Sequence, residues 1–197
     1  MAMTSSNMLA LGQAAADFNL PSTEHQNVCL DDYTGAKGLV VAFICNHCPY
    51  VIHVAPQLAK VAKAYQEKGI AFVAINSNDT QQYPEDDMQH MIQEKQNRQY
   101  PFAYLLDESQ DVAKAYSAAC TPDFYLFDGD LKLVYRGQFD DSRPTRISSG
   151  NYDSSKHQAS GRDLIQAMDG LLNDTDIVQH QSASMGCNIK WKAGNQP

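Results

Sequence analysis

The stretch that decides the fold is Leu39-Val40-Val41-Ala42-Phe43-Ile44-Cys45-Asn46-His47-Cys48-Pro49. It begins with six apolar residues in a row, a pattern typical of a central strand that is covered on both faces. Two cysteines separated by two residues follow at once. Pro49 suits the first turn of a helix, where its missing N–H costs little. The sequence therefore predicts a strand-to-helix junction with both thiols at the start of the helix.

The neighbouring segments extend this junction into a parallel β-α-β unit. Apolar residues at helical spacing predict a helix from Val51 to Lys68, kinked at Pro56, and a second apolar run from Ile70 to Ile75 predicts another strand. Buried strands joined by a helix run parallel. The other expected elements are an N-terminal hairpin over 17–30, helices over 84–98, 111–116 and 162–172, and strands over 102–105, 123–127 and 131–135.

These elements predict an α/β fold with a central mixed β-sheet flanked by helices, in one domain over residues 16–172. Residues 1–15 are small or polar, and we expect a flexible N-terminus there. Residues 138–161 are polar and are expected to form a long surface loop. Residues 173–197 are expected to be an irregular C-terminal tail that packs on the domain, with Trp191, the only tryptophan, as its apolar anchor.

Charge and composition exclude several functional classes. The 197 residues carry a formal net charge of -8 and no basic stripe, which argues against nucleic-acid binding. No signal peptide is visible and the longest apolar run is too short to cross a bilayer, so no membrane association is expected. Five cysteines, an odd number with one close pair, favour reactive thiols in a reducing compartment. We expect a cytoplasmic protein, monomeric or homodimeric.

The Cys45-Asn46-His47-Cys48 motif indicates thiol-disulfide chemistry. The thiolate is the reactive form of cysteine, and the free N–H groups and dipole of a helix N-terminus stabilise it. The two-residue spacing lets the second sulfur resolve a mixed disulfide within the motif. Cys45 and Cys48 are therefore the candidate catalytic residues. Asn46, His47 and Pro49 are expected to tune the motif, and a protonated His47 would lower the thiol pKa.

Metal binding is the alternative chemistry for the same cysteines. Cys45, His47 and Cys48, with Cys120 or Cys187, could hold zinc or copper(I). A zinc site needs a second ligand pair, however, and the other cysteines of the sequence are single. We favour redox chemistry with no metal and no cofactor beyond a redox-active disulfide. A third alternative is a redox fold that serves as an interaction module with silent thiols.

The second candidate feature is Thr121-Pro122, directly before the strand expected at 123–127. X-Pro bonds are the place where cis peptides occur at low cost. A cis bond would expose the Thr121 backbone for pairing with an extended substrate, whereas an ordinary loop proline is the alternative. Cys120 would then lie close to the motif or serve as a small buried hydrophobic residue.

The C-terminal tail carries a further thiol. Gly186 before Cys187 suggests a tight turn. We expect the tail to dock near the motif with Cys187 as a candidate resolving thiol, and a packing role is the alternative. Cys29, in the N-terminal hairpin, is expected to be structural.

Two arginines flank the start of the 138–161 stretch. Arg136 and Arg143 flank the stretch Gly137–Ser142 and are expected to pair with Asp140 and Asp141 in a solvated loop.

The order of these features resembles the thioredoxin-like superfamily from about Asp17 to Leu172. Four separated segments are more closely similar to the peroxiredoxin-like group of the AhpC/TSA and redoxin families, whose members carry a Cys-x-x-Cys motif. These segments are Phe43–Val51, Cys120–Phe124, Tyr135–Pro144 and Gly186–Trp191. The resemblance implies a thioredoxin-like fold. It also implies a thiol-disulfide oxidoreductase with an antioxidant or redox role. Weak thiol peroxidase activity would be a second activity of the same site.

The resemblance leaves two roles open for the sulfurs. As in thioredoxin, Cys45 would be the exposed nucleophile and Cys48 the buried resolving thiol; as in a peroxiredoxin, Cys48 would attack peroxide. Pro122 would be the cis-proline facing the motif. Cys45 stands where peroxiredoxins have Thr or Ser, residues 121–127 hold no arginine, and Leu39 stands where thioredoxins bury an Asp. The implied partners are protein or small-molecule disulfides or peroxides, and an unidentified thiol reductant.

Overall fold

The computed structural model describes residues 3–175, 177 and 180–197. Its centre is a five-stranded mixed sheet with the strand order β6-β5-β4-β8-β9. Within it β4 pairs in parallel with β5 and antiparallel with β8. The strands of this sheet are β4 (Gly38–Phe43), β5 (Ile70–Asn76), β6 (Ala103–Leu106), β8 (Asp123–Asp128) and β9 (Leu133–Gly137).

The central strand β4 is buried on both faces, as its unbroken apolar run predicts. Leu39, Val41 and Phe43 belong to one apolar cluster, while Val40 and Ala42 belong to the other. Successive side chains of a strand point to opposite faces, so one strand feeds both clusters.

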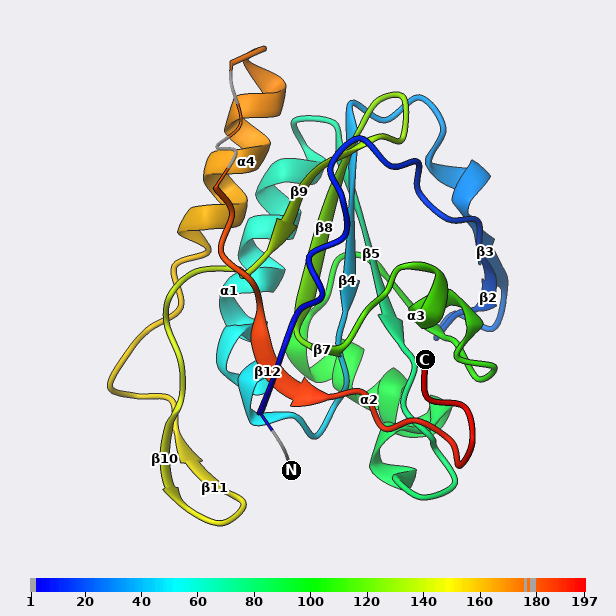
Figure 1. Cartoon of the computed structure of the whole chain (residues 1–197), viewed down its shortest axis with the longest axis vertical. Helices are drawn as coiled ribbons and strands as arrows, with labels where there is room; N and C mark the ends of the chain where they lie inside the picture. The colour runs from blue at the N-terminus through cyan, green and yellow to red at the C-terminus, as the bar shows by residue number, and fades with distance from the viewer. Residues whose placement is uncertain (1–2, 176, 178–179) are drawn as a thin grey trace.

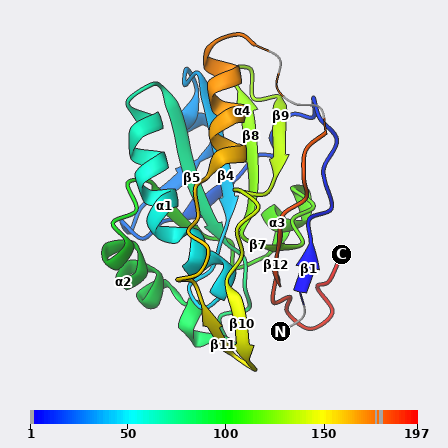
Figure 2. The same cartoon turned by 90° about the vertical axis from the view of Figure 1, so that its left-hand side faces the viewer.

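Helices cover one face of the sheet and a thinner layer covers the other. In Figures 1 and 2, α1 (Pro49–Gln66) and α4 (Arg162–Leu172) lie together on one face. The opposite face carries the short helix α3 (Asp111–Ala115) and the hairpin of β2 (Asn19–Pro21) and β3 (Asn27–Cys29), with the 3-10 turn η1 (Leu30–Tyr33). The predicted α/β fold with a helix-flanked mixed sheet is confirmed.

Three predicted segments differ from the structure. The helix over 84–98 is split into the 3-10 turn η2 (Pro84–Asp86) and α2 (Met88–Arg98), because Asp87 is extended and caps α2 by accepting a 2.9 Å hydrogen bond from the His90 N–H. The strand predicted from Leu131 starts at β9, since Leu131 itself has a positive φ of 56°. The loop over 138–161 contains a hairpin of β10 (Thr145–Ser148) and β11 (Asn151–Asp153).

The two terminal segments meet in a second sheet, so part of the tail that we predict to be irregular forms a strand. β1 (Met3–Ser5), β12 (Met185–Asn188) and β7 (Cys120–Thr121) pair in the order β1-β12-β7, all antiparallel. Figure 2 shows β1 and β12 side by side, apart from the main sheet. These strands are two to four residues long, and long-range pairing rather than a local pattern specifies them.

The tail beyond β12 is held by backbone and amide groups of the domain. The Lys190 N–H donates to Asn78 Oδ1 and its carbonyl accepts from the Asp79 N–H, both at 2.8 Å. Gln110 donates to the Lys190 carbonyl at 2.9 Å and accepts from the Lys192 N–H at 2.9 Å. Trp191 is half-buried and packs against the second apolar cluster. Among the described residues, no helix has the length and apolar character needed to span a bilayer.

Candidate functional site

The dithiol motif sits where β4 ends and α1 begins. Cys48 is the N-cap residue of α1 with an extended backbone, and Pro49 occupies the first helical position. The Cys48 carbonyl accepts the N–H of Ile52 at 2.9 Å, which starts the helical hydrogen bonding. This is the predicted strand-to-helix junction, and it places Cys48 among the free N–H groups of the helix start.

Both sulfurs converge on Thr121. Cys45 Sγ lies 3.4 Å from Thr121 Oγ1, and Cys48 Sγ lies 3.1 Å from the Thr121 carbonyl oxygen, to which the thiol donates. The Thr121–Pro122 peptide is cis, as predicted. The exposed fractions of Cys45 and Cys48 are 2% and 0%, so Cys45 is not the exposed thiol of the thioredoxin alternative.

The two thiols differ in how easily they ionise. Burial opposes ionisation of Cys48, but hydrogen bonds from Cys187, Cys45 and the backbone N–H of Val51 outweigh it and hold the Cys48 pKa well below its ordinary value. Burial, the hydrogen bond to Cys48 and the nearby Asp86 carboxylate raise the pKa of Cys45 well above its ordinary value. Cys48 is therefore the thiol of the pair that ionises more easily.

The middle of the motif is clamped by η2. The Asn46 N–H donates to Asp86 Oδ1 at 2.8 Å, and its side-chain amide donates to the Glu85 carbonyl at 2.8 Å. The Asp86 carboxylate is fully buried and also accepts from Asn78 Nδ2 at 2.7 Å. Asp86 is thus a site residue that the sequence analysis does not single out, because it lies 40 residues from Asn46 and carries no local signal.

His47 is turned toward this clamp. Its Nδ1 lies 2.7 Å from Asp86 Oδ2, and its ring stacks on Tyr83 with centroids 5.6 Å apart and 9° between planes. Burial opposes protonation of His47, but the Asp86 carboxylate outweighs it and raises the His47 pKa. The sequence analysis predicts that a protonated His47 lowers the thiol pKa. At Cys45 this effect is opposed, because the adjacent Asp86 carboxylate raises the pKa of the Cys45 thiol.

The C-terminal strand closes the site on the other side. Cys187 is the register partner of Thr121, and its exposed fraction is 2%. A Cβ on Gly186 would lie 1.9 Å from the Thr121 carbonyl oxygen, so only glycine permits this approach. Hydrogen bonding to Cys48, together with burial, raises the pKa of the Cys187 thiol, which stays protonated and donates. The predicted docking of the tail near the motif brings a third thiol to Cys48.

Of the two remaining cysteines, Cys120 adjoins Thr121 and lies near enough to Cys48 for their charges to interact. Cys120 is fully buried with its Sγ 3.8 Å from the Pro122 carbonyl oxygen, and burial raises its pKa. That environment fits the hydrophobic packing alternative. Cys29 is half-buried at the end of β3.

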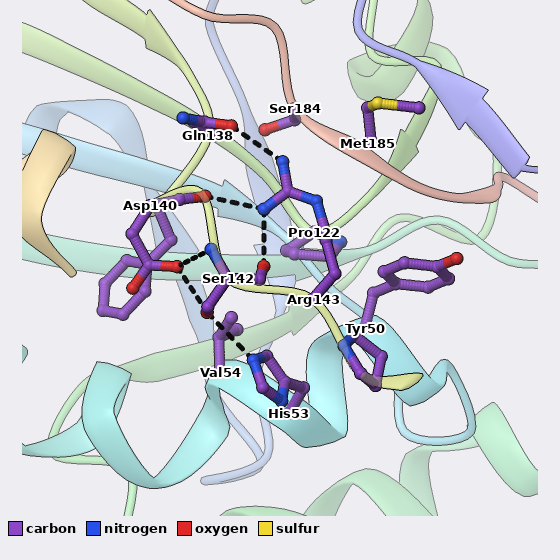
Figure 3. A pocket seen from close by; sticks show the side chains of 12 residues that line it. Tyr50, His53, Val54, Pro122, Gln138, Asp140, Ser142, Arg143, Ser184 and Met185 are labelled. Carbon is purple, nitrogen blue, oxygen red and sulfur yellow. Dashed lines mark hydrogen bonds between the residues drawn. The ribbon is translucent and has the colours of Figure 1, made fainter. Parts of the chain in front are cut away.

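The wall beside Pro122 is built from the segment that follows β9. Arg143 donates to the carbonyl oxygens of Asp140 and Ser142, each at 2.6 Å, and to Gln138 Oε1 at 2.7 Å. Figure 3 shows its side chain held between Gln138 and the 140–142 backbone, next to Pro122. The cavity there has a volume of about 10 Å³, room for about one water molecule. The cavity beside this wall is therefore too small to hold a substrate.

The arginine pairing that we predict is wrong. Arg143 binds the backbone of Asp140, and the Asp140 carboxylate instead accepts from Ser142 and from the N–H of Gly161. Arg136 binds the side chain of Gln181 and the Leu9 carbonyl. The nearest cation to the Asp141 carboxylate is Arg162, at 3.4 Å.

A buried acid follows the cis-proline directly. Asp123 is fully buried, and its Oδ2 accepts from Ser6 Oγ and from the Tyr125 hydroxyl, each at 3.0 Å. Its Oδ1 has no hydrogen-bond partner among the described residues. Burial raises the Asp123 pKa to about 7. The N-terminal segment is thus tied to the core through a group that titrates near neutral pH.

One group of potential metal donors is present among the described residues. Donor atoms of Cys45, His47 and Asp86 all lie within 4.8 Å of one another. The alternative cluster of Cys45, His47 and Cys48 differs from it, because the ring of His47 faces Asp86.

The fold and the placement of the motif agree with a comparison to protein families. The model of the AhpC/TSA family matches residues 11–136, which span the motif, the clamp and the cis-proline. The chain belongs to the AhpC/TSA family. The resemblance that the motif segments indicate is therefore confirmed at the level of the family.

Individual relatives agree with this assignment. Thiol-disulfide oxidoreductase ResA of Bacillus thuringiensis subsp. konkukian is 23% identical over 131 residues, which cover 66% of this chain and 71% of that protein. An uncharacterized conserved protein of Geobacillus kaustophilus has a crystal structure that superposes with a TM-score of 0.90 and 47% identity, covering 98% of this chain and 97% of that one.

More distant structures share the fold. The thioredoxin domain of a thiol-disulfide oxidoreductase from Bacteroides vulgatus superposes with a TM-score of 0.57 at 21% identity, covering 66% of this chain and 89% of that chain. The predicted thioredoxin-like fold is confirmed, and the family carries oxidoreductase activity.

Proposed function

We propose that the chain is a thiol-disulfide oxidoreductase that cycles between the Cys45–Cys48 dithiol and disulfide, with Cys48 as the attacking thiolate. The observation that carries the proposal is the convergence of both sulfurs on Thr121, beside the cis peptide, and the pKa of Cys48 is the lower of the two. Hydrogen bonding to the charged form is what makes a thiolate available at neutral pH.

The reaction follows from that assignment. The Cys48 thiolate attacks one sulfur of a substrate disulfide, forms a mixed disulfide and releases the first substrate thiolate. Cys45 then loses its proton and attacks the Cys48 sulfur, which releases the second substrate thiol and forms the Cys45–Cys48 disulfide. The clamp by η2 fixes the backbone between the two sulfurs during this exchange. A thiol reductant returns the disulfide to the dithiol by the reverse steps.

We also propose a resolving role for Cys187. Its thiol contacts Cys48 in the same cluster as Cys45, so a Cys48–Cys187 disulfide is an alternative product of the second step. The test is disulfide mapping by mass spectrometry in a Cys45→Ser variant after exposure to an oxidised peptide. A Cys48–Cys187 linkage is the expected product, and its absence while Cys48 is fully trapped with the peptide would contradict the role.

Peroxide is a further proposed substrate, in line with the AhpC/TSA family and an antioxidant role. The Cys48 thiolate would take one oxygen from a hydroperoxide and become a sulfenic acid, releasing water or an alcohol, and the Cys45 thiol would condense with it and release water. No arginine lies in residues 121–127, and Arg143 donates to backbone and amide oxygens. We therefore expect slower turnover with peroxide than with a disulfide.

The experiment that tests the oxidoreductase proposal is a redox-buffer titration followed by a turnover assay. Mass spectrometry of the alkylated full chain is expected to show a two-electron transition that links Cys45 and Cys48 and disappears in either Cys→Ser variant. Coupled turnover with a protein disulfide and with peroxide then assigns the preferred substrate, and Cys29→Ser is the matched control. Failure to form the Cys45–Cys48 disulfide at any potential would remove the proposal.

A second candidate function is soft-metal binding, favoured by the convergence of Cys45, His47 and Asp86 donors within 4.8 Å. A thiolate, an imidazole and a carboxylate are ligands that zinc accepts. Elemental analysis of the purified chain, combined with a count of reactive thiols, tests it. One tightly held metal per chain, lost in Asp86→Asn, would support this candidate, and a full set of reactive thiols without metal would exclude it.

We also propose that the protein works in the cytoplasm, where thiols are kept reduced. Immunodetection after cell fractionation is the test, and recovery in an exported fraction would contradict it.

A further inference from the structure

Asn46 lies between the two cysteines of the motif and is held at three of its atoms. Its backbone N–H donates to Asp86 Oδ1 and its amide Nδ2 donates to the Glu85 carbonyl, both at 2.8 Å. Its amide oxygen Oδ1 accepts the Tyr104 hydroxyl at 3.0 Å. The first two contacts belong to the η2 clamp, whereas the third comes from β6 of the central sheet. Asn46 therefore ties the motif to two separate elements of the fold.

The orientation of the Asn46 amide follows from its partners. A peptide carbonyl such as that of Glu85 only accepts hydrogen bonds, so the amide nitrogen must face it. The amide oxygen then faces Tyr104, and the Tyr104 hydroxyl is the donor. Phenylalanine at position 104 would keep the aromatic ring and leave this amide oxygen without its donor.

Tyr104 is a rigid anchor for the Asn46 amide. Its exposed fraction is 0%, and it lies on β6 in register with Ala74 of β5. Tyr100 packs against it edge to face, with ring centroids 6.3 Å apart and 88° between planes. A side chain that is enclosed by a strand pair and a neighbouring ring has few rotamers available. The central sheet therefore fixes the position of the hydroxyl that holds Asn46.

Tyr100 supplies an internal comparison for Tyr104. It is also buried and belongs to the same apolar cluster. Its hydroxyl, however, has no hydrogen-bond partner among the residues that the structure describes. The two buried hydroxyls thus differ in one respect, which is the contact of Tyr104 with the motif.

We propose that Tyr104 is a positioning residue for the disulfide exchange, acting through Asn46. It holds the motif in the geometry in which Cys45 attacks the Cys48 sulfur. The inference rests on the proposed Cys45–Cys48 cycle. The two sulfurs already converge on Thr121, at 3.4 and 3.1 Å, and a disulfide needs them about 2 Å apart. An anchored link between them leaves little ordering to be done before the bond forms, which accelerates an intramolecular step.

The step that this positioning serves is the second one of the cycle. The Cys45 thiol gives its proton to solvent, and the resulting thiolate attacks the Cys48 sulfur of the mixed disulfide. The bond between Cys48 and the substrate sulfur breaks as the Cys45–Cys48 bond forms, and the substrate leaves as a thiolate that takes up a proton. The first step depends instead on access of the substrate to Cys48. Loss of the Tyr104 hydroxyl is therefore expected to slow the second step and to spare the first.

The first measurement is rapid mixing of the full chain, in a Cys29→Ser background, with dithiobis(nitrobenzoate), a disulfide that releases a coloured thiolate. The first release depends on reagent concentration, and the second, which reports resolution by Cys45, does not. Tyr104→Phe is expected to slow the second release roughly fivefold and to leave the first within about twofold, since one positioning hydrogen bond is lost. Tyr100→Phe is the matched control and is expected to keep both rates. Equal second-phase rates in the two variants would overturn the proposal.

The second measurement separates action through Asn46 from a general effect on packing. Asn46→Ala removes the acceptor of the Tyr104 hydroxyl, and it is expected to slow the second phase at least as much as Tyr104→Phe. Adding Tyr104→Phe to Asn46→Ala is then expected to have no further effect, because both changes remove the same contact. A Tyr104→Phe effect of full size in the Asn46→Ala background would show that the hydroxyl acts on packing, and the proposal would be wrong.

The third measurement does not depend on disulfide exchange. If wild type shows no second phase and no Cys45–Cys48 disulfide, the proposed function fails, and amide hydrogen exchange of the reduced protein still decides whether Tyr104 holds the motif. The Asn46 N–H is expected to exchange roughly fivefold faster in Tyr104→Phe than in Tyr100→Phe, because the side chain that steadies it has lost a hydrogen bond. Equal exchange in the two variants would remove the hold of Tyr104 on the motif.

Discussion

The dithiol lies between two walls that are built in different ways. On one side, the η2 clamp uses a fully buried carboxylate, Asp86, that binds Asn46, Asn78 and His47 at once. On the other side, the strap of residues Met185–Asn188 pairs with β7 at two positions and with β1 at three, and its Gly186 approaches the Thr121 carbonyl oxygen closely. A buried charge with several partners resists displacement, whereas a short ladder between anchored ends lifts at low cost. We therefore expect the η2 clamp to hold the motif more firmly than the strap holds its side of the site.

The largest expected effect comes from the sulfur between the two walls. Cys48→Ser replaces the proposed attacking thiolate with a hydroxyl that stays protonated at neutral pH. Turnover of a protein disulfide is expected to fall roughly a thousandfold or more, because the nucleophile is lost. Initial rates against Cys29→Ser measure the effect. A Cys48→Ser variant that keeps more than a tenth of the wild-type rate would shift the attacking role to Cys45.

The clamp is broken by Asp86→Asn. An amide cannot accept from all three of its neighbours, and we expect a loss of about 3 kcal/mol in unfolding free energy. The His47 pKa is raised in the folded protein above its ordinary value of 6.5. Its contribution to stability is therefore fully present below pH 6.5 and is lost as the pH rises through the folded pKa.

Urea unfolding of wild type and Asp86→Asn across this pH range measures both effects. The difference in unfolding free energy between wild type and Asp86→Asn is expected to become smaller as His47 loses its proton. A gap that is constant with pH would show that His47 and Asp86 are not coupled through charge.

On the strap side, Asp123→Asn tests the tie to the N-terminal segment. The folded pKa of Asp123, about 7, lies above its ordinary value of 3.8. Its contribution to stability is therefore present below pH 3.8 and is lost as the pH rises through about 7. Wild type is expected to lose on the order of 2 kcal/mol relative to the variant between pH 5 and 8. Thermal unfolding at several pH values measures this, and parallel curves for both proteins would contradict the buried titration.

The smallest expected effect comes from the anchor beyond the strap. Gln110→Ala removes the donor to the Lys190 carbonyl and the acceptor of the Lys192 N–H, at a cost of about 1–2 kcal/mol. Exchange at residues 190–192 is expected to rise, while the redox equilibrium stays near that of wild type. A large shift of that equilibrium would mean that the tail is coupled to the dithiol.

The same contrast between walls explains what the sequence could predict. β4, the motif and α1 follow from residues that are adjacent in the chain, so their apolar run and Pro49 sufficed. The cis-proline was accessible because proline carries its own backbone signal. The roles of Asp86 and of the strap could not be predicted in this way. They arise from contacts between residues that are 40 and more than 60 positions apart in the sequence. The split of the predicted helix at Asp87 is part of the same gap, because it is this break that aims Asp86 at the motif.

The position of Trp191 gives the molecule an internal optical reporter. It is the only tryptophan of the chain, and it packs half-buried on the apolar cluster just past the anchored Lys190. If the tail stays docked, the indole stays packed and its fluorescence emission maximum is unchanged by oxidation. If the tail detaches, the indole meets water and the emission shifts to longer wavelength. A rapid-mixing fluorescence trace on the unlabelled protein can therefore show whether the tail moves during a single turnover.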